Sequence, residues 1–258
     1  MTVDTQGVIA CSRYSFAPNS LHFCGPERQN DMLAYVKGRR ADNGLVEILH
    51  RFETLYPYLV LIASENHIQD PFDRQVVEAY WLGNTLLDGV KTSALAAHLT
   101  DTFNLKAKVK KKHVGPMMNP IVESGVPQHN FHVLNIFVRT GHHAVPHTLS
   151  TMDQCRVSWG KVVETGSRVK GQGSSKEIGK PCIVETQPLM YGKGKFILGV
   201  PQKKAVTSVS VHPKMGEWVS IHWGYVCDIL THQQRMHLAY YTHKALDTAN
   251  RSQLVSRI

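Results

Sequence analysis

The spacing of apolar residues changes partway along the chain, and this change limits the possible folds more than any other feature of the sequence. Between Asn43 and Asn66, apolar residues recur at intervals of three and four, which places them on one face of a helix. Beyond Leu105, apolar residues instead form short runs rich in β-branched and aromatic types, mostly separated by glycine-rich turns. The sequence therefore predicts an α+β fold in which a helical part precedes a β part.

Local signals divide the helical part into several helices. Pro57 is expected to kink the first long helix or to split it in two. Asp70 and Pro71 predict the start of the next helix, with Asp70 as the N-cap, proline at the first helical position and Asp73 near the positive helix end. We expect that helix to break near Gly83 and a further helical stretch to follow.

Glycine and proline punctuate residues 115–127 and mark a boundary between the two parts. From Tyr225 onward the apolar pattern becomes helical again. We therefore expect a helical N-terminal domain at residues 1–112, a linker with a bridging strand at 113–150, and a β-barrel with a C-terminal helix at 151–258. The predicted strands are Phe131–Val138, Arg156–Glu164, Cys182–Thr186, Phe196–Val200 and Trp218–His222.

Composition excludes several classes of protein. The chain has 258 residues, and none of its apolar runs approaches the roughly 18 to 20 residues of a membrane span. Its first residues lack the basic and then apolar segments of a secretory signal. The five cysteines are scattered and form no C-x-x-C pair, which favours free thiols over disulfides or a zinc ribbon. These features predict a cytoplasmic protein that has no membrane partner.

The net charge of +9 is partly concentrated in a run of lysines between residues 106 and 112. Such a run can attract nucleic acid, an anionic membrane or an acidic protein. No aromatic residues interleave with these lysines, as binding to single strands would favour, so we interpret the run as a solvated linker. A nucleic-acid-binding module is kept only as a third hypothesis, and it predicts a steep dependence of binding on salt.

Two segments of the β part resemble the HypC/HupF family, the assembly chaperones of nickel-iron hydrogenases. Residues 155–164 (CRVSWGKVVE) resemble the opening of that family, in which a cysteine precedes a short apolar strand and then glycine-lysine-valine-valine-glutamate. Residues 216–226 (GEWVSIHWGYV) are similar to the family's glycine-acid-aromatic-valine strand, which ends in histidine. The resemblance covers about residues 152–250 and implies a small OB-like β-barrel followed by a helix.

This resemblance implies a metallochaperone, which is not itself an enzyme. In that family the cysteine and the histidine serve an iron centre bearing cyanide and carbon monoxide, which is handed to the hydrogenase large subunit. By motif position, Cys155 would be the thiolate ligand and His222 its neighbour across the barrel mouth. A thiolate suits low-spin iron with such ligands, and a nearby imidazole can lower the thiol pKa or donate a hydrogen bond. The implied partners are a HypD-like scaffold protein and a hydrogenase large-subunit precursor.

The sequence departs from that family at three points. The cysteine of the family lies at the mature N-terminus, whereas Cys155 follows residues 152–154 in the middle of the chain. Arg156 and Trp159 replace the usual leucine and proline. The interval between cysteine and histidine is also longer, and we expect the extra length within residues 166–180.

The whole chain has a second, broader resemblance, to an uncharacterised bacterial family associated with hydrogenase gene clusters. It rests on short segments of the N-terminal half and implies a biological context without a mechanism. Those segments are residues 13–19 (RYSFAPN), 24–26 (CGP), 70–73 (DPFD) and 78–81 (EAYW).

Cys24 and His132 are candidates for an additional site. Cys24 precedes a predicted helix whose N-terminus could lower the thiol pKa, although a packed loop thiol is the preferred interpretation. His129 and His132 would point to opposite faces of a strand that contained both, so that one could face a site. The alternative function is an enzyme that makes or loads a metal ligand with Cys24 and histidines of the 129–147 region.

Cys227 is the last candidate. If the chain became helical at Gly224, Cys227 could face the barrel and join Cys155 and His222. Small buried cysteines are common in protein cores, so burial is the preferred interpretation. Cys182 begins a predicted strand, has no evident partner in the sequence, and is assigned no role.

Overall fold

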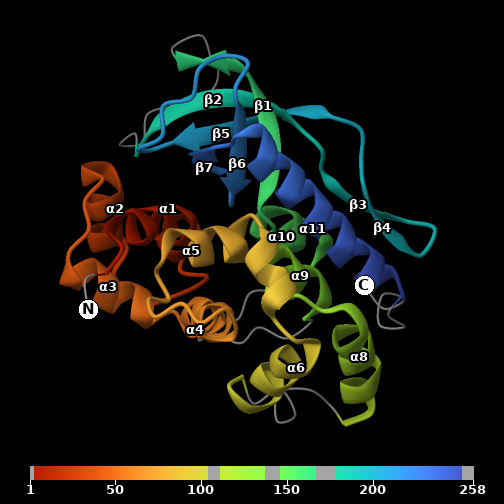
Figure 1. Cartoon of the computed structure of the whole chain (residues 1–258). Helices are drawn as coiled ribbons and strands as arrows, with labels where there is room; N and C mark the ends of the chain where they lie inside the picture. Colours follow the sequence, from red (N-terminus) through yellow and green to blue (C-terminus); the bar gives the residue numbers. More distant parts are fainter. Residues whose placement is uncertain (1–2, 104–110, 137–145, 167–177, 252–258) are drawn as a thin grey trace.

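Helices and a β-barrel form two adjoining parts of the molecule (Figure 1). The structure, a computed structural model, describes residues 3–103, 111–136, 146–166 and 178–251. The predicted α+β class, with a helical N-terminal part, a small barrel and a C-terminal helix, is confirmed. Within the described ranges, none of the helices combines the length and the apolar character needed to cross a bilayer.

The first half consists of helices joined by short loops. Two helices fill the region where one kinked or divided helix was expected, and the break lies at residues 51–54, just before Pro57. Pro57 itself sits in the first turn of the second helix, where a missing N–H breaks no intrahelical bond. The elements are α1 (Thr5–Ser20), α2 (Gln29–Gly38), α3 (Asn43–His50), α4 (Leu55–Glu65), α5 (Arg74–Trp81), the 3-10 helix η1 (Thr85–Gly89) and α6 (Thr92–Asp101).

The predicted N-cap of α5 is wrong by three residues. Asp73 caps the helix, because its side chain accepts a hydrogen bond from the backbone N–H of Gln75 at 2.8 Å. Asp70 instead accepts from the backbone N–H groups of Phe72 and Asp4, each at 2.8 Å, and so ties this loop to the start of α1. Proline at residue 71 therefore lies in the turn before the helix.

The predicted helix break at Gly83 is confirmed, and a close packing contact explains the glycine. Gly83 has a φ of 87°, a conformation that residues with a side chain rarely adopt. A Cβ atom there would overlap the ring of Tyr241 in the C-terminal helix α11 (His232–Arg251). The hydroxyl of Tyr241 also donates to the carbonyl oxygen of Asn84 at 3.0 Å. Gly83 thus allows α11 to pack against the helical part.

Where the structure describes the expected linker, helices joined by short loops stand in place of the bridging strand. Helices α8 (Lys111–Ser124), α9 (His129–Asn135) and α10 (Leu149–Cys155) occupy this region. The run after Phe131 has the residue types of a strand, but Gln128 caps a helix there by accepting from the N–H groups of Asn130 and Phe131. Lysines 106–110 and residues 137–138 of the predicted strand lie outside the described residues.

Five strands close into a small barrel in the order β1-β2-β5-β7-β6, consistent with an OB-like fold. All neighbouring pairs are antiparallel except β5 and β7, which are parallel. Apolar residues, most of them valines, fill the interior. The strands are β1 (Ser158–Thr165), β2 (Lys180–Thr186), β5 (Gln202–Ser208), β6 (Trp218–His222) and β7 (Tyr225–Ile229).

Two details of the β part differ from the prediction. The run predicted at Phe196–Val200 does not enter the barrel, because β4 (Lys195–Leu198) pairs with β3 (Leu189–Gly192) in a separate hairpin. The chain after Tyr225 is the strand β7 and becomes helical only at His232. Strand β7 pairs with both β5 and β6, so the barrel closes only if this segment is extended.

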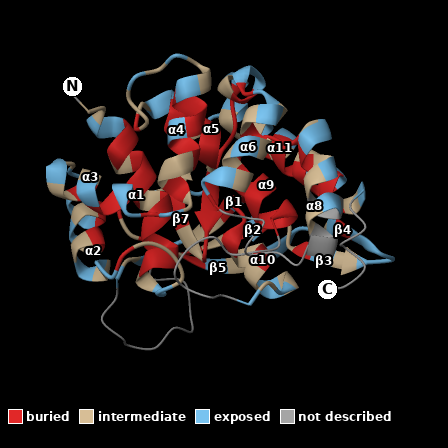
Figure 2. Ribbon diagram, turned by 90° about the horizontal axis from the view of Figure 1, so that it is seen from below, coloured by how far each residue is buried: buried red, intermediate tan, exposed pale blue. Residues whose placement is uncertain are grey.

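The helical part and the barrel meet in a shared hydrophobic core, which runs from α1 to α11 and includes residues of α10 and of the turn after β6. The barrel interior forms a second, separate cluster. Figure 2 shows that the buried residues are concentrated in the middle of the molecule. Helix α1 lies against β6 and β7: the side chain of Arg13 pairs with Asp228 at 2.5 Å, and the hydroxyls of Tyr14 and Ser220 are 2.8 Å apart. The junction between the two parts is therefore tightly packed.

Candidate metal centre

One cysteine and two histidines from three separate elements meet at this junction. Cys155 is the last residue of α10, His222 the last of β6 and His129 the first of α9. Their potential metal-binding atoms all lie within 4.8 Å of one another, and all three residues are buried. The structure therefore brings together Cys155 and His222, the two residues chosen from the sequence, and adds His129.

The ring of His222 is oriented as a metal ligand would be. Its Nδ1–H donates to the carbonyl oxygen of Tyr14 at 2.8 Å, because a carbonyl can only accept. In the neutral ring the lone pair is then on Nε2. A backbone carbonyl that holds one ring nitrogen in this way is a common partner of metal-binding histidines, since it sets the tautomer and the direction of the other nitrogen.

His129 links the helical part to the backbone of Cys155. The Nε2–H of His129 donates to the carbonyl oxygen of Cys155 at 2.8 Å. The Nδ1 atom then carries the lone pair and accepts from the hydroxyl of Tyr80 at 3.1 Å. His129 thus positions Cys155 as the structure stands, and it would bind a metal ion only by giving up one of these two hydrogen bonds.

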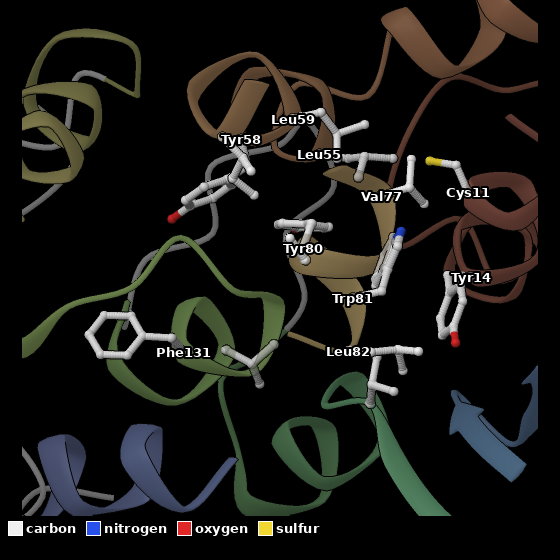
Figure 3. Close-up of a cluster of buried hydrophobic side chains, with 14 of the residues drawn as sticks. Cys11, Tyr14, Leu55, Tyr58, Leu59, Val77, Tyr80, Trp81, Leu82 and Phe131 are labelled. Carbon is white, nitrogen blue, oxygen red and sulfur yellow. The ribbon is translucent and has the colours of Figure 1, made fainter. Parts of the chain in front are cut away.

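Aromatic rings surround the cluster and keep it in a region of low dielectric. The indole of Trp81 lies 4.6 Å from the ring of His129 and 5.4 Å from that of His222, measured between centroids. Figure 3 shows Trp81 and Tyr80 on α5, with Tyr14 of α1 on the far side of the indole. Burial raises the pKa of both tyrosines well above its usual value. The two phenols are therefore neutral at physiological pH and act as hydrogen-bonding groups.

A cavity of about 60 Å³ extends from the cluster and has room for a few water-sized groups. His132 lines it together with His129, because the two residues are three apart on a helix and so share a face. The prediction that they point to opposite faces of a strand is wrong for this reason. The hydroxyl of Tyr58 is 2.8 Å from Nδ1 of His132 and holds that ring in place.

Cys24 lines the same cavity from the loop after α1. The side-chain amide of Asn19 donates to the carbonyl oxygens of Cys24 and Pro26, at 3.0 and 2.7 Å, and so fixes the loop. The ring of Phe23 packs against Trp223 with 4.7 Å between centroids. The structure therefore brings two of the three additional candidates, Cys24 and His132, to the cavity that contains Cys155 and His222.

Cys227 does not line this cavity. It lies in β7, is fully buried in the shared core, and its pKa is raised by burial. Its carbonyl oxygen accepts from Nε of Arg13 at 2.7 Å. The preferred interpretation of Cys227 as a packed core thiol agrees with this position, since the chain is not helical at Gly224.

Arg156 explains one departure from the HypC/HupF pattern. The residue is 1 % exposed, and its guanidinium pairs with the carboxylate of Asp153 at 2.8 and 3.0 Å. The same guanidinium donates to the carbonyl oxygen of Gln187 at 2.5 Å, and Asp153 accepts from the N–H of Leu189 at 2.7 Å. Arg156 and Asp153 thus fasten the β3–β4 hairpin to the end of α10, next to Cys155.

His129 is the site residue that sequence reasoning missed. The pattern around it indicated a strand, and a structural role was assumed for it. The available signal was Gln128, a residue that can cap a helix and would have placed His129 and His132 on one helical face.

Comparison with protein families found one match. The profile of a family described as a family of unknown function, DUF6390, matches residues 3–256. Comparisons with curated proteins and with solved structures found no match.

Proposed function

Because the chain belongs to the DUF6390 family, whose function is unknown, we propose its function from the site: a HypC-like metallochaperone of nickel-iron hydrogenase maturation. It would carry an iron fragment bearing cyanide and carbon monoxide through Cys155 to the large-subunit precursor. The observation that supports this proposal most is the meeting of Cys155 and His222 within 4.8 Å, on an OB-like barrel followed by a helix. These two residues come from the two segments that resemble the HypC/HupF family.

The donor set fits the proposed cargo. The thiolate of Cys155 is a soft anionic ligand, and Nε2 of His222 presents a borderline nitrogen donor. The aromatic walls of the cavity exclude bulk water, which protects labile diatomic ligands, and the volume of about 60 Å³ leaves space for small ligands beside the metal. His129 would hold the Cys155 backbone in place while the fragment is bound.

The position of Cys155 within the chain separates this carrier from one whose cysteine stands at a free N-terminus. Cys155 ends a helix, is 6 % exposed, and has chain on both sides. A fragment held there would lie inside the protein. Delivery to a hydrogenase large-subunit precursor would therefore require a partner, such as a HypD-like scaffold protein, that opens the junction between the helical part and the barrel.

Infrared spectroscopy tests this proposal directly. The protein is purified anaerobically from a hydrogenase-producing host that contains the scaffold partner, as wild type, Cys155→Ala and Cys182→Ala. We expect bands in the cyanide and carbonyl stretching region for the wild type and for Cys182→Ala, and none for Cys155→Ala. Cys182 is a matched control, because it is also buried but lies inside the barrel among valines. Absence of bands from all three folded proteins would contradict the proposal.

A second candidate function is favoured by the position of Cys24 and His132. Both line the cavity that contains Cys155, so a nucleophilic thiol and an imidazole are available for chemistry on a metal ligand or on its one-carbon precursor. This enzyme hypothesis predicts turnover of a one-carbon donor by the purified protein. Wild-type rates from Cys24→Ala and His132→Gln variants would exclude these residues as catalytic.

A further inference from the structure

Four potential ligands in the cavity are deeply buried, and a fifth is not. The exposed fractions are 8 % for His129, 6 % for His132, 6 % for Cys155 and 1 % for His222. Cys24, in contrast, is only half-buried, although it lines the same cavity. Among the described residues that line this cavity, Cys24 is thus the cysteine or histidine that a metal ion arriving from solvent meets first.

Cys24 and Cys155 both line the cavity. Tyr80 also lines the cavity and donates its hydrogen bond to His129. The same cavity therefore connects the side chains of Cys24 and Cys155.

The loop that carries Cys24 faces the turn that follows His222. The pair of Phe23 and Trp223 joins these two segments, and Phe23 is half-buried, so the aromatic pair lies at the edge of the cavity. The turn is anchored close to Cys155, because the backbone N–H of Trp223 donates to the carbonyl oxygen of the neighbouring Gln154 at 2.8 Å. The Cys24 loop and the turn after His222 therefore meet at the edge of the cavity.

We propose that Cys24 is an entry ligand, which captures a thiophilic transition-metal ion and passes it to Cys155 and His222 inside the cavity. This proposal rests on the proposed metal-binding function of Cys155 and adds the route by which the site is filled. Thiolates bind such ions quickly and exchange readily, which makes a half-exposed cysteine suited to capture. His132, on the same cavity wall, would supply a nitrogen donor during the passage.

The passage is a ligand exchange without any change of oxidation state. The bond between the metal and Cys24 sulfur breaks as the bond to Cys155 sulfur forms. Cys155 gives up its thiol proton in this step, and the released thiolate of Cys24 takes up one proton. The exchange is therefore balanced in protons and charge, and Cys24 returns to the thiol form, ready for the next ion.

The rate of cobalt loading tests the proposal. Full-length protein is reduced, kept anaerobic and mixed with Co²⁺ in a stopped-flow instrument, while the thiolate-to-cobalt charge-transfer absorption is recorded. We expect Cys24→Ala and Cys24→Ser to load several-fold more slowly than wild type but to reach the same final spectrum and the same equilibrium affinity. Cys11→Ala is the matched control, because Cys11 is fully buried in α1 and does not line the cavity. It should load at the wild-type rate.

The other outcomes separate this role from the metal site itself. Unchanged loading rates in both Cys24 variants would overturn the entry role and leave the Cys155 site intact. A lower equilibrium affinity or a weaker charge-transfer band in these variants would make Cys24 a permanent ligand, which also overturns it. If the wild type bound no Co²⁺, or if Cys155→Ala bound it equally well, the entry role would fail together with the proposed carrier function.

Discussion

The barrel interior and the cavity beside it are both buried and both contain a cysteine, yet their surroundings differ. Cys182 lies among the valines of the barrel, where burial raises its pKa to about 11. Cys155 lies beside two imidazoles and a ring of aromatic side chains. Burial alone therefore says little about the role of a thiol. The neighbours decide whether it only fills space or can bind a ligand.

The largest difference between the two thiols should appear in metal binding. Replacing Cys155 by alanine removes the one thiolate of the His129, Cys155 and His222 cluster. We expect the affinity for Co²⁺ to fall by about three orders of magnitude, or about 4 kcal/mol, as the share of one ligand in a metal site. A competition titration against a chelator measures this. Wild-type affinity together with a lower melting temperature would show that Cys155 only fills space.

The next prediction concerns the close contact between Gly83 and Tyr241, which packs α11 against the helical part. Gly83→Ala would place a Cβ atom in the ring of Tyr241 and would strain a backbone with a φ of 87°. We expect a loss of about 3 kcal/mol in the free energy of unfolding, measured by urea denaturation. Gly192→Ala is the control, because nothing lies within 4 Å of the added atom and its φ is not positive. Equal midpoints for the two variants would mean that the contact is not close.

Acid should lower the free energy of unfolding through His98, whose ring packs against Tyr58 with 5.2 Å between centroids. Burial lowers the pKa of His98 to about 4 in the folded protein, while the unfolded chain keeps a value near 6.5. The unfolded state therefore binds the extra proton first. Stability is complete well above pH 6.5 and falls by about 3 kcal/mol as the pH decreases to 4.

Replacing His98 by leucine should remove this part of the acid sensitivity. Melting temperatures recorded between pH 7 and 4 measure the slope for each variant. The exposed His212 is the control, and His212→Asn should retain the wild-type slope. If His98→Leu kept the wild-type dependence of melting temperature on pH, the pKa of His98 would be the same in the folded and unfolded states.

The smallest effect is expected inside the barrel. Cys182→Ala removes one buried sulfur atom from a valine-rich interior, so the free energy of unfolding should fall by about 1 kcal/mol. Affinity for Co²⁺ should not change. Isothermal titration and thermal melting of the same preparation check both statements. A loss of Co²⁺ binding in Cys182→Ala would contradict the distinction between Cys182 and Cys155.

Local patterns were enough to predict the fold class, and the resemblance to the HypC/HupF family supplied two of the clustered residues. Apolar spacing predicted the helical part, and strand-like runs predicted β1, β2 and β6. Cys155 and His222 were chosen by their motif positions, and the barrel geometry places them together because β1, which follows Cys155, pairs with β6. The pairing of Ser158 with Ile221 brings the end of α10 and the end of β6 side by side.

The remaining features depend on contacts between distant segments, which no local pattern contains. All seven residues of α9 are buried, so this helix has no polar face and its residue types resemble those of a strand. Strand β7 was interpreted as helix because its extended form is required only by its partners β5 and β6. His129 could not be assigned to the site for the same reason, since its contact with Cys155 spans separate elements.

The strand order of the barrel also determines when during synthesis the cluster can form. The N-terminal helices leave the ribosome first, and Cys24 and His129 leave it with them. His222 takes its place only when β6 pairs with β1, and the barrel closes only when β7 has reached both β5 and β6. A growing chain that lacks β6 therefore presents Cys155 and His129 without His222. The proposed loading would therefore require the finished protein.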